Sequence, residues 1–207
     1  MTLNRGIHGP VHPFVAISGT SRPDNYTFHA LAVVRDELTK NGASVDHFDA
    51  RELSLSFPGS PPTDDARRLK QAIENCSGVV IVTPEYHGSF AAMTKLIIEN
   101  LGFPSVLAKK PVALLGVAGG RIGAIKSLEQ LRAVCAHTGA VVIPGSVSVA
   151  GVRAAFNAEG ACLDQDVETS LRGLATGLMD FVKDFVCPKY ALEAMIRGET
   201  KPWIASL

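Results

Sequence analysis

Short runs rich in valine, isoleucine and alanine recur along the chain, and longer segments with a helical pattern separate them. The runs predict strands over residues 14–18, 45–48, 79–83, 111–118 and 140–144. Their apolar residues are mostly consecutive and do not alternate with polar ones, which is typical of strands that are covered on both faces. This feature restricts the fold to a parallel sheet enclosed between two layers of helices.

The segments between these runs carry apolar residues at spacings of three and four, as amphipathic helices do. In the first segment Leu31, Val34 and Leu38 follow this spacing, and Asn41-Gly42 is a good signal for the end of a helix. The pattern predicts helices over 26–41, 64–76, 91–101, 123–137 and 166–185. The alternation indicates an α/β fold with a five-stranded, doubly wound parallel sheet, helices on both faces and right-handed crossovers.

The chain has 207 residues, of which 46% are hydrophobic, enough to build one core without disulfides or a structural metal. We interpret residues 1–207 as a single domain, with an N-terminal extension over 1–12 and a C-terminal tail over 188–207. The tail contains a short helical pattern followed by the apolar sequence Pro202-Trp203-Ile204. Packing of this sequence on its own core and contact with a second subunit both stay open.

Twenty basic and twenty acidic residues cancel, so no bulk charge favours nucleic acid or an anionic membrane as a partner. The apolar runs are far shorter than the ~20 residues that cross a bilayer, and the first dozen residues lack the apolar region of a secretory signal. The four cysteines form no CxxC pair, and no metal site is expected. We therefore expect a cytoplasmic protein with no nucleic-acid partner and no membrane insertion.

Three loops follow predicted strands at their carboxyl ends, which is where open parallel sheets bind ligands. The first loop, residues 18–27, combines hydroxyl groups, Arg22 and the start of a helix. This set of donors suits a phosphate monoester, whereas the alternative interpretation is a polar turn in which threonine or asparagine caps the helix. The loop has neither the GxxxxGK[ST] nor the GxGxxG pattern, so a different phosphate-bearing cofactor is indicated.

The second and third loops are suited to a flat ligand. The second begins at Thr83 and reads TPEYHGSFAAMTK, and its Pro84 and Gly88 stiffen a turn that can present backbone amides and carbonyls. The third, residues 116–123, reads GVAGGRIG, and its glycines allow the backbone to approach a ring closely. Glu85 and His87 lie two residues apart on a turn and need not face one another, so no acid–base pair is expected.

Together these loops resemble the NADPH-dependent FMN reductase family, whose second loop reads approximately TPEYNxSxPGxLKNA and whose first loop carries GSxR. Positions 83–86, 89 and 95 match the second loop, and Thr20 and Arg22 fall on the first. His87 replaces asparagine, Ala91-Ala92 replaces proline and glycine, and Thr20 replaces serine. The likeness runs in order through residues 12–185.

The resemblance implies a flavodoxin-like fold, FMN as cofactor and NADPH or NADH as co-substrate, with no catalytic side chain and no metal. It implies that the first loop surrounds the phosphate and ribityl chain, the backbone of the second meets the ring edge, and the third borders the ring. The residues so assigned are Thr20, Ser21, Arg22, Asn25, Tyr26 and Thr27, then Pro84, Glu85, Tyr86 and His87, and then Gly119 and Gly120.

The implied activity is that of an FMN-dependent NAD(P)H oxidoreductase, which passes electrons to a small acceptor: free flavin, a quinone, an azo compound or an oxidised metal ion. A homodimer or homotetramer is expected. An alternative is a non-enzymatic FMN-binding electron carrier or redox-regulated interaction protein, which would share the phosphate loop. A phosphate-binding regulatory domain without flavin is a third hypothesis. Neither the acceptor nor the preference between NADPH and NADH follows from the sequence.

Overall fold

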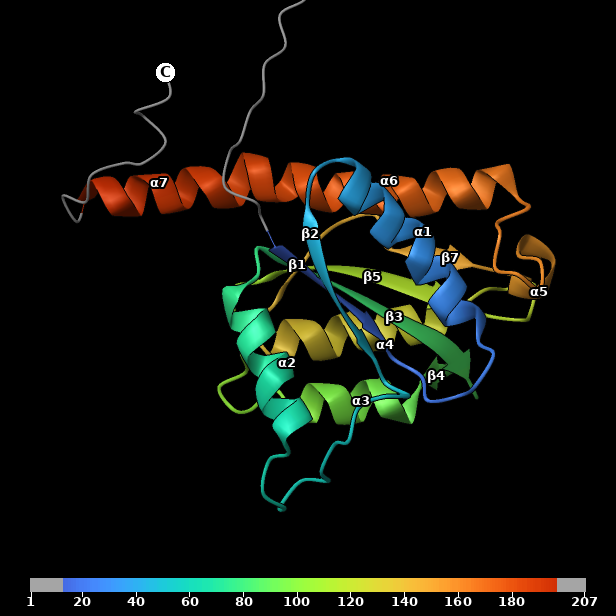
Figure 1. Ribbon diagram of the computed structural model, residues 1–207, viewed down its shortest axis with the longest axis horizontal. Coiled ribbons are helices and arrows are strands. Elements are labelled where there is room, and N and C mark those ends of the chain that lie inside the picture. The colour runs from blue at the N-terminus through green and yellow to red at the C-terminus, as the bar shows by residue number, and fades with distance from the viewer. Residues whose placement is uncertain (1–12, 197–207) are drawn as a thin grey trace, which may run out of the picture.

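The sheet of the computed structural model, which describes residues 13–196, lies between two layers of helices (Figure 1). Its central strands run in the order β2-β1-β3-β5-β6 and are parallel. Their bounds are β1 (Pro13–Ser18), β2 (Ser44–Asp49), β3 (Gly78–Tyr86), β5 (Pro111–Val117) and β6 (Val141–Val142). The five predicted strand positions and the doubly wound arrangement are confirmed.

Successive residues of a strand belong alternately to two hydrophobic cores, one on each face of the sheet. This explains why the apolar residues are consecutive. Phe14 and Ala16 pack with α1 (Tyr26–Lys40) and α6 (Gln165–Phe181) on one face. Val15 and Ile17 belong to the core on the other face. The helices covering that second face are α2 (Asp64–Asn75), α3 (Ala92–Glu99) and α4 (Ile125–His137).

The fifth strand is split, which the sequence pattern did not predict. β6 pairs with the start of β5, whereas β7 (Val147–Val149) pairs with its end, so the two occupy the same place in the sheet. Between them Pro144 has no N–H to donate and Gly145 has a φ of 79°. The strand predicted over 140–144 is therefore only two residues long, and the pairing with β5 resumes at Val147.

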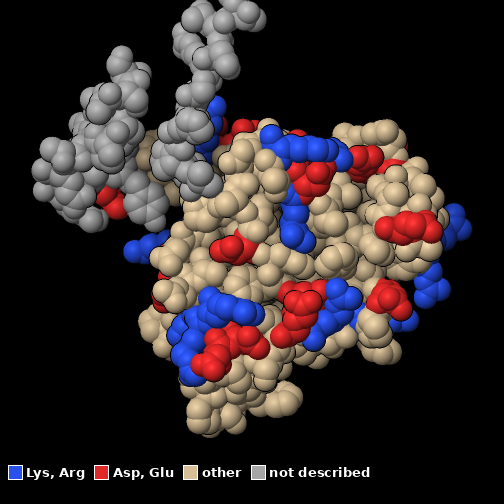
Figure 2. Space-filling view, viewed as in Figure 1, with Lys and Arg blue, Asp and Glu red and all other residues tan. Residues whose placement is uncertain are grey.

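Two short elements complete the described chain after β3 and β7. β4 (Ser89–Phe90) forms an antiparallel hairpin with the end of β3, and α5 (Val152–Ala155) follows β7. Among residues 13–196, none of the helices combines the length and the apolar character needed to cross a bilayer. Figure 2 shows acidic and basic side chains interspersed on the face in view.

The last predicted helix ends earlier than expected and is continued by two further segments. α6 stops at Phe181 and passes into the π-helical η1 (Val182–Val186) and then into α7 (Cys187–Ile196), which extends past the sheet in Figure 1. The predicted tail therefore begins as a helix. Residues 1–12 and 197–207, including Pro202-Trp203-Ile204, lie outside the described residues.

An ion-pair cluster joins α1 to α6. The Arg172 guanidinium donates to Asp36 at 2.8 Å, to Glu37 at 2.9 Å and to Glu168 at 2.7 Å. Hydrogen bonds from Lys40 and Arg172 lower the pKa of Asp36, and one from Arg172 lowers the pKa of Glu37. Because these carboxylates titrate lower in the folded state, their contribution to stability is present at neutral pH and is lost in acid.

Replacement of Arg172 by methionine tests this cluster. We expect the melting temperature at pH 7 to fall by about 2–4 °C, since the cluster is partly exposed and screened by solvent. The difference from the wild type should shrink as the pH falls through the ordinary carboxyl values of 3.8 and 4.5. Thermal melts at several pH values measure both effects. A difference that stays constant down to pH 3 would assign the loss to packing and not to charge.

Candidate functional site

The three predicted loops meet at a cavity of about 140 Å³. It lies at the carboxyl ends of β1, β3 and β5, the edge at which a ligand site was expected. Eight of the predicted residues line it: Arg22, Asn25, Tyr26, Thr27, Pro84, Glu85, Tyr86 and Gly119. The fold therefore brings together side chains from the first, second and third loops in one place.

Four predicted residues lie beside the cavity walls and not in them. Thr20 is buried, with its hydroxyl 3.4 Å from that of Tyr86, and Ser21 is exposed on the same loop. His87 is exposed at the tip of the second turn. Gly120 is also exposed, and its carbonyl accepts the N–H groups of Gly123 and Gly151.

The first loop both caps its helix and lines the cavity. The side-chain oxygen of Asn25 accepts the N–H of Phe28 at 2.8 Å, and its amide nitrogen donates to the Arg22 carbonyl at 2.7 Å. Asn25 is thus the N-cap of α1, as the alternative interpretation of this loop proposed. Because the same residue fixes the backbone at Arg22, capping and ligand binding are compatible functions of one loop.

The second loop is a two-residue hairpin turn between β3 and β4. Tyr86 pairs with Ser89, and the central residues His87 and Gly88 have φ values of 51° and 74°. Two successive positive φ angles are characteristic of the type I′ turn, in which Asn-Gly is strongly preferred. Histidine is less suited than asparagine to this backbone conformation.

Replacement of His87 by asparagine is therefore expected to stabilise the protein. Relief of the unfavourable φ should raise the melting temperature by about 1–3 °C. A thermal melt of both proteins with and without FMN measures the change. His87→Ala, which lacks the tolerance of asparagine for positive φ, serves as the matched control and should give no increase. A lower melting temperature for His87→Asn would show that the imidazole makes a stabilising contact.

The second loop is fastened to α4 by side chains. The carboxylate of Glu85 accepts the N–H of Ser127 at 3.1 Å in the first turn of α4, where the N-cap residue is Ala124. Gln130 donates to the Gly88 carbonyl at 2.9 Å and accepts from the Ser89 hydroxyl at 2.7 Å. Glu85 therefore caps a helix, which agrees with the expectation that it is not half of an acid–base pair.

The third loop is held by a segment that the sequence pattern did not reveal. Ala118 donates its N–H to Val149 in β7 at 2.9 Å and accepts the N–H of Val152 at 3.0 Å. The cavity wall also contains five residues that were not predicted: Asp24, Val117, Ala118, Val152 and Arg153. Asp24 lies within the first loop and was open to prediction, whereas Arg153 reaches the cavity only because β7 returns to the sheet beside β5.

The donor set of the cavity fits a phosphate group. Arg22 and Arg153 supply guanidinium groups, and the N-terminus of α1, with no acidic residue in its first turn, supplies a favourable dipole and backbone N–H groups. Asp24 adds an opposing charge, whereas the Glu85 carboxylate is engaged by α4. Within the described part of the chain, no group of three or more His, Cys, Asp or Glu is placed to hold a metal ion.

Comparison with known proteins identifies the family. Residues 13–154 match the family model of the NADPH-dependent FMN reductases. The chain belongs to this family. It is 38% identical over 141 residues to an NADPH azoreductase from Bacillus sp. (strain OY1-2), covering 67% of this chain and 76% of the relative. It is 32% identical over 136 residues to a 2-hydroxy-1,4-benzoquinone reductase from Burkholderia sp., covering 61% and 72%.

Solved structures agree on the fold. A flavoenzyme NAD(P)H:acceptor oxidoreductase from Paracoccus denitrificans aligns with a TM-score of 0.68 at 22% identity, covering 84% of this chain and 98% of that one. The fold is flavodoxin-like, and the chain is an FMN-dependent NAD(P)H oxidoreductase. The family, fold, enzyme class and cofactor predicted from the three loops are confirmed. The naming of the relatives as reductases favours an enzyme over a non-enzymatic electron carrier.

Proposed function

We propose that this reductase holds FMN with its phosphate in the cavity formed by the three loops and uses NADPH to reduce quinones or azo compounds. The observation that carries the proposal is the meeting of Arg22, the α1 N-terminus, the β3–β4 turn and the Gly119 loop at one cavity. The two acceptor classes are supported by the names of two relatives, an azoreductase and a benzoquinone reductase. Free flavin and oxidised metal ions are the other two expected acceptor classes, and the same assay can test them.

The size of the cavity indicates which part of FMN it encloses. Sites that bury a whole ligand of this kind have volumes of roughly 300–1,000 Å³, whereas this cavity has about 140 Å³. The phosphate and ribityl chain fit here, beside Arg22 and the first turn of α1. The ring would then lie outside the cavity, beside Tyr86, a residue that is 37% exposed, and the exposed Gly119.

The protein residues bind, orient and stabilise, and none acts as an acid or a base. FMN, when bound, would supply the chemistry of hydride transfer and of electron transfer. The Arg22 guanidinium neutralises the phosphate, and Asn25 keeps the loop backbone in place for it. The backbone of 84–87 would offer hydrogen-bonding groups to the ring edge, and its attachment to α4 through Glu85 holds this backbone in place for that contact.

An anaerobic reduction experiment tests the proposed function. The purified protein is reconstituted with FMN, NADPH is added without oxygen, and the visible flavin absorption is followed. We expect bleaching within seconds and recovery of the absorption when a benzoquinone or an azo dye is added. FMN that binds but stays oxidised would favour the carrier hypothesis. Absence of FMN binding would contradict both, and the same assay with NADH measures the nucleotide preference.

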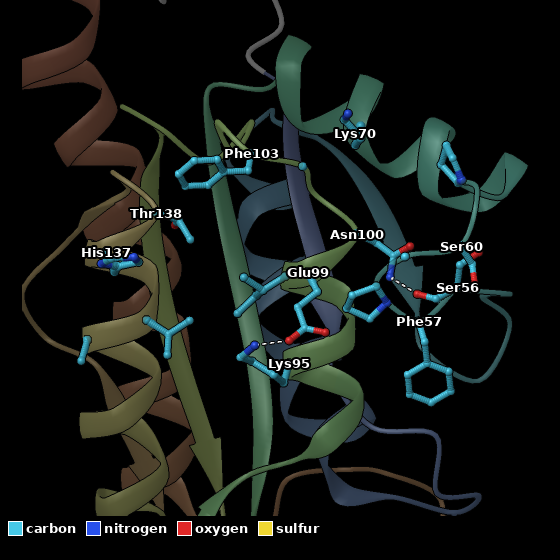
Figure 3. Close-up of a pocket in the computed structure, with 17 residues that line it drawn as sticks. Ser56, Phe57, Ser60, Lys70, Lys95, Glu99, Asn100, Phe103, His137 and Thr138 are labelled. Atoms are coloured by element: carbon cyan, nitrogen blue, oxygen red, sulfur yellow. Dashed lines mark hydrogen bonds and ion pairs between the residues drawn. The ribbon is translucent and has the colours of Figure 1, made fainter.

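We also propose a homodimer, alone or paired into a homotetramer, formed through a groove of about 870 Å³ between the 56–62 loop, α3 and α4. Figure 3 shows the groove with Phe57 and Phe103 on its walls and Lys95 paired with Glu99 on α3. Phe57 is 75% exposed and Phe103 is 97% exposed, so both offer apolar surface to a partner. The groove is lined by the later residues of α3 and α4, and it shares no lining residue with the cavity at the carboxyl ends of the strands.

Replacement of Phe103 by glutamate tests this interface. The wild type is expected to have the mass of two or four chains, and Phe103→Glu should halve that mass at micromolar concentration, because a charge would be buried in the contact. Light scattering during size-exclusion chromatography measures the mass. Leu163→Glu, at a residue that is 66% exposed elsewhere on the surface, is the control and should leave the mass unchanged. A monomeric wild type would contradict the proposal.

A cytoplasmic location is part of the same proposal, supported by the state of the cysteines. All four lie within the described residues and are free thiols. Burial raises the pKa of Cys76 to about 11 and that of Cys135 to about 12, so these two are unreactive packing residues. Free thiols persist in reducing compartments. Detection of the chain outside the cell by fractionation would contradict this location.

A further inference from the structure

A buried hydroxyl connects two of the loops that face the cofactor cavity. Thr94 lies near the start of α3, is fully buried and is not part of the cavity wall. Its hydroxyl donates to the carbonyl of Gly19 at 2.8 Å and lies 3.0 Å from the hydroxyl of Thr83. Gly19 lies in the first loop, directly after β1, and Thr83 is the first residue of the second loop.

The Thr83 hydroxyl continues this connection to the other end of the second loop. It accepts the N–H of Ala91 at 3.0 Å and lies 3.1 Å from the carbonyl oxygen of Pro84. We use the name flavin-edge turn for residues 84–90, the end of β3, the His87-Gly88 turn and β4. Ala91, the N-cap of α3, follows this segment and Pro84 begins it, so Thr83 joins its two ends. The second loop therefore has attachments of its own that do not involve Thr94.

The first loop depends more directly on Thr94. Gly19 donates its N–H to the carbonyl of Val82 at 2.8 Å, and the carbonyl of Gly19 accepts the hydrogen bond from the Thr94 hydroxyl. Both backbone groups of Gly19 are therefore paired. A Cβ atom on Gly19 would lie 2.2 Å from the Thr94 hydroxyl and 2.7 Å from the Val82 carbonyl. The start of the loop is thus packed directly against the Thr94 hydroxyl, three residues before Arg22.

We infer that Thr94 is a positioning residue for the phosphate end of FMN, an inference that rests on the proposed function. Its hydroxyl holds the Gly19 carbonyl and so sets the place of the loop that carries Arg22. An apolar side chain of the same shape would leave that carbonyl buried without this donor, and the loop would have to move to pair it elsewhere. The base of the flavin-edge turn would keep its bond between Thr83 and Ala91.

Comparison of FMN with riboflavin tests the inference, because riboflavin lacks the phosphate. Dissociation constants for both flavins are measured by fluorescence quenching in the wild type, Thr94→Val and Thr94→Ser. We expect Thr94→Val to weaken FMN binding about tenfold, equivalent to ~1.4 kcal/mol, and riboflavin binding less than twofold. Thr94→Ser keeps the hydroxyl and should stay within about twofold of the wild type for both flavins.

The outcomes separate this inference from the proposed function. Equal weakening of both flavins by Thr94→Val would indicate a general structural role and overturn the inference, as would unchanged FMN affinity. A wild type that fails to bind FMN would overturn the proposed function itself. If Thr94→Val does not fold, Thr94→Ala, which leaves room for water at the Gly19 carbonyl, should still show a larger loss for FMN than for riboflavin.

Discussion

Replacement of Arg22 by alanine is expected to weaken FMN binding by about 10- to 100-fold. The guanidinium lines the cavity where the phosphate is proposed to lie, and a charge-assisted hydrogen bond is worth roughly 1.5–3 kcal/mol. Riboflavin affinity should change little, since the lost contact is to the phosphate. Titration of the apoprotein with each flavin, followed by fluorescence, measures the two constants.

Two further variants sharpen this prediction. Arg22→Lys keeps the charge but not the planar fork of donors, so an intermediate loss is expected. Arg67→Ala removes an exposed arginine on α2 that pairs with Asp64, and FMN binding should be unaffected. An unchanged FMN affinity in Arg22→Ala would remove Arg22 from the proposed phosphate site.

Replacement of Gly116 by valine is expected to have the largest effect on stability. A Cβ atom on Gly116 would lie 2.7 Å from that of Ala124 and 2.9 Å from the Cγ of Leu128, so α4 would have to move away from β5. Overpacking of this kind costs about 1–3 kcal/mol, which corresponds to a fall of roughly 2–12 °C in melting temperature for a domain of this size. Thermal denaturation followed by circular dichroism measures it.

The same substitution should also weaken flavin binding. α4 carries Ser127 and Gln130, which hold the Glu85 carboxylate and the Gly88 carbonyl of the flavin-edge turn. A displaced α4 therefore weakens the binding of FMN and riboflavin alike. Gly177→Ala, on α6 with no atom within 4 Å of the added Cβ, is the matched control and should be neutral or slightly stabilising. Normal stability in Gly116→Val would show that α4 can shift without cost.

Much of the fold follows from residues that are neighbours in sequence. The consecutive apolar runs at β1, β3 and β5 indicate strands buried on both faces, and the structure divides their residues between two cores. The end of α1 at Lys40 follows from Asn41-Gly42, where Gly42 has a φ of 85°. Three loops at the carboxyl ends of strands, together with their family resemblance, predicted eight of the residues that line the cavity, among them Arg22 and Gly119.

The tertiary structure decided which of these groups are free to meet a ligand. Glu85 and Asn25 both line the cavity as predicted, and their side chains in addition cap α4 and α1. Thr94 lies in a segment with an ordinary helical pattern. Its hydroxyl can donate a hydrogen bond to the Gly19 carbonyl only because α3 packs against the first loop. Arg153 reaches the cavity because a split fifth strand resumes as β7.

The sequence by itself determined the alternation of strands and helices, the edge of the sheet at which the cavity lies, and the family. Those properties depend on local spacing, backbone preference and short motifs, which residues close along the chain specify. Only the tertiary structure decided the partners of Glu85, Thr94 and Arg153. Hydrogen bonds and cavity walls join residues far apart in the chain, and their partners are chosen by how the helices pack on the sheet.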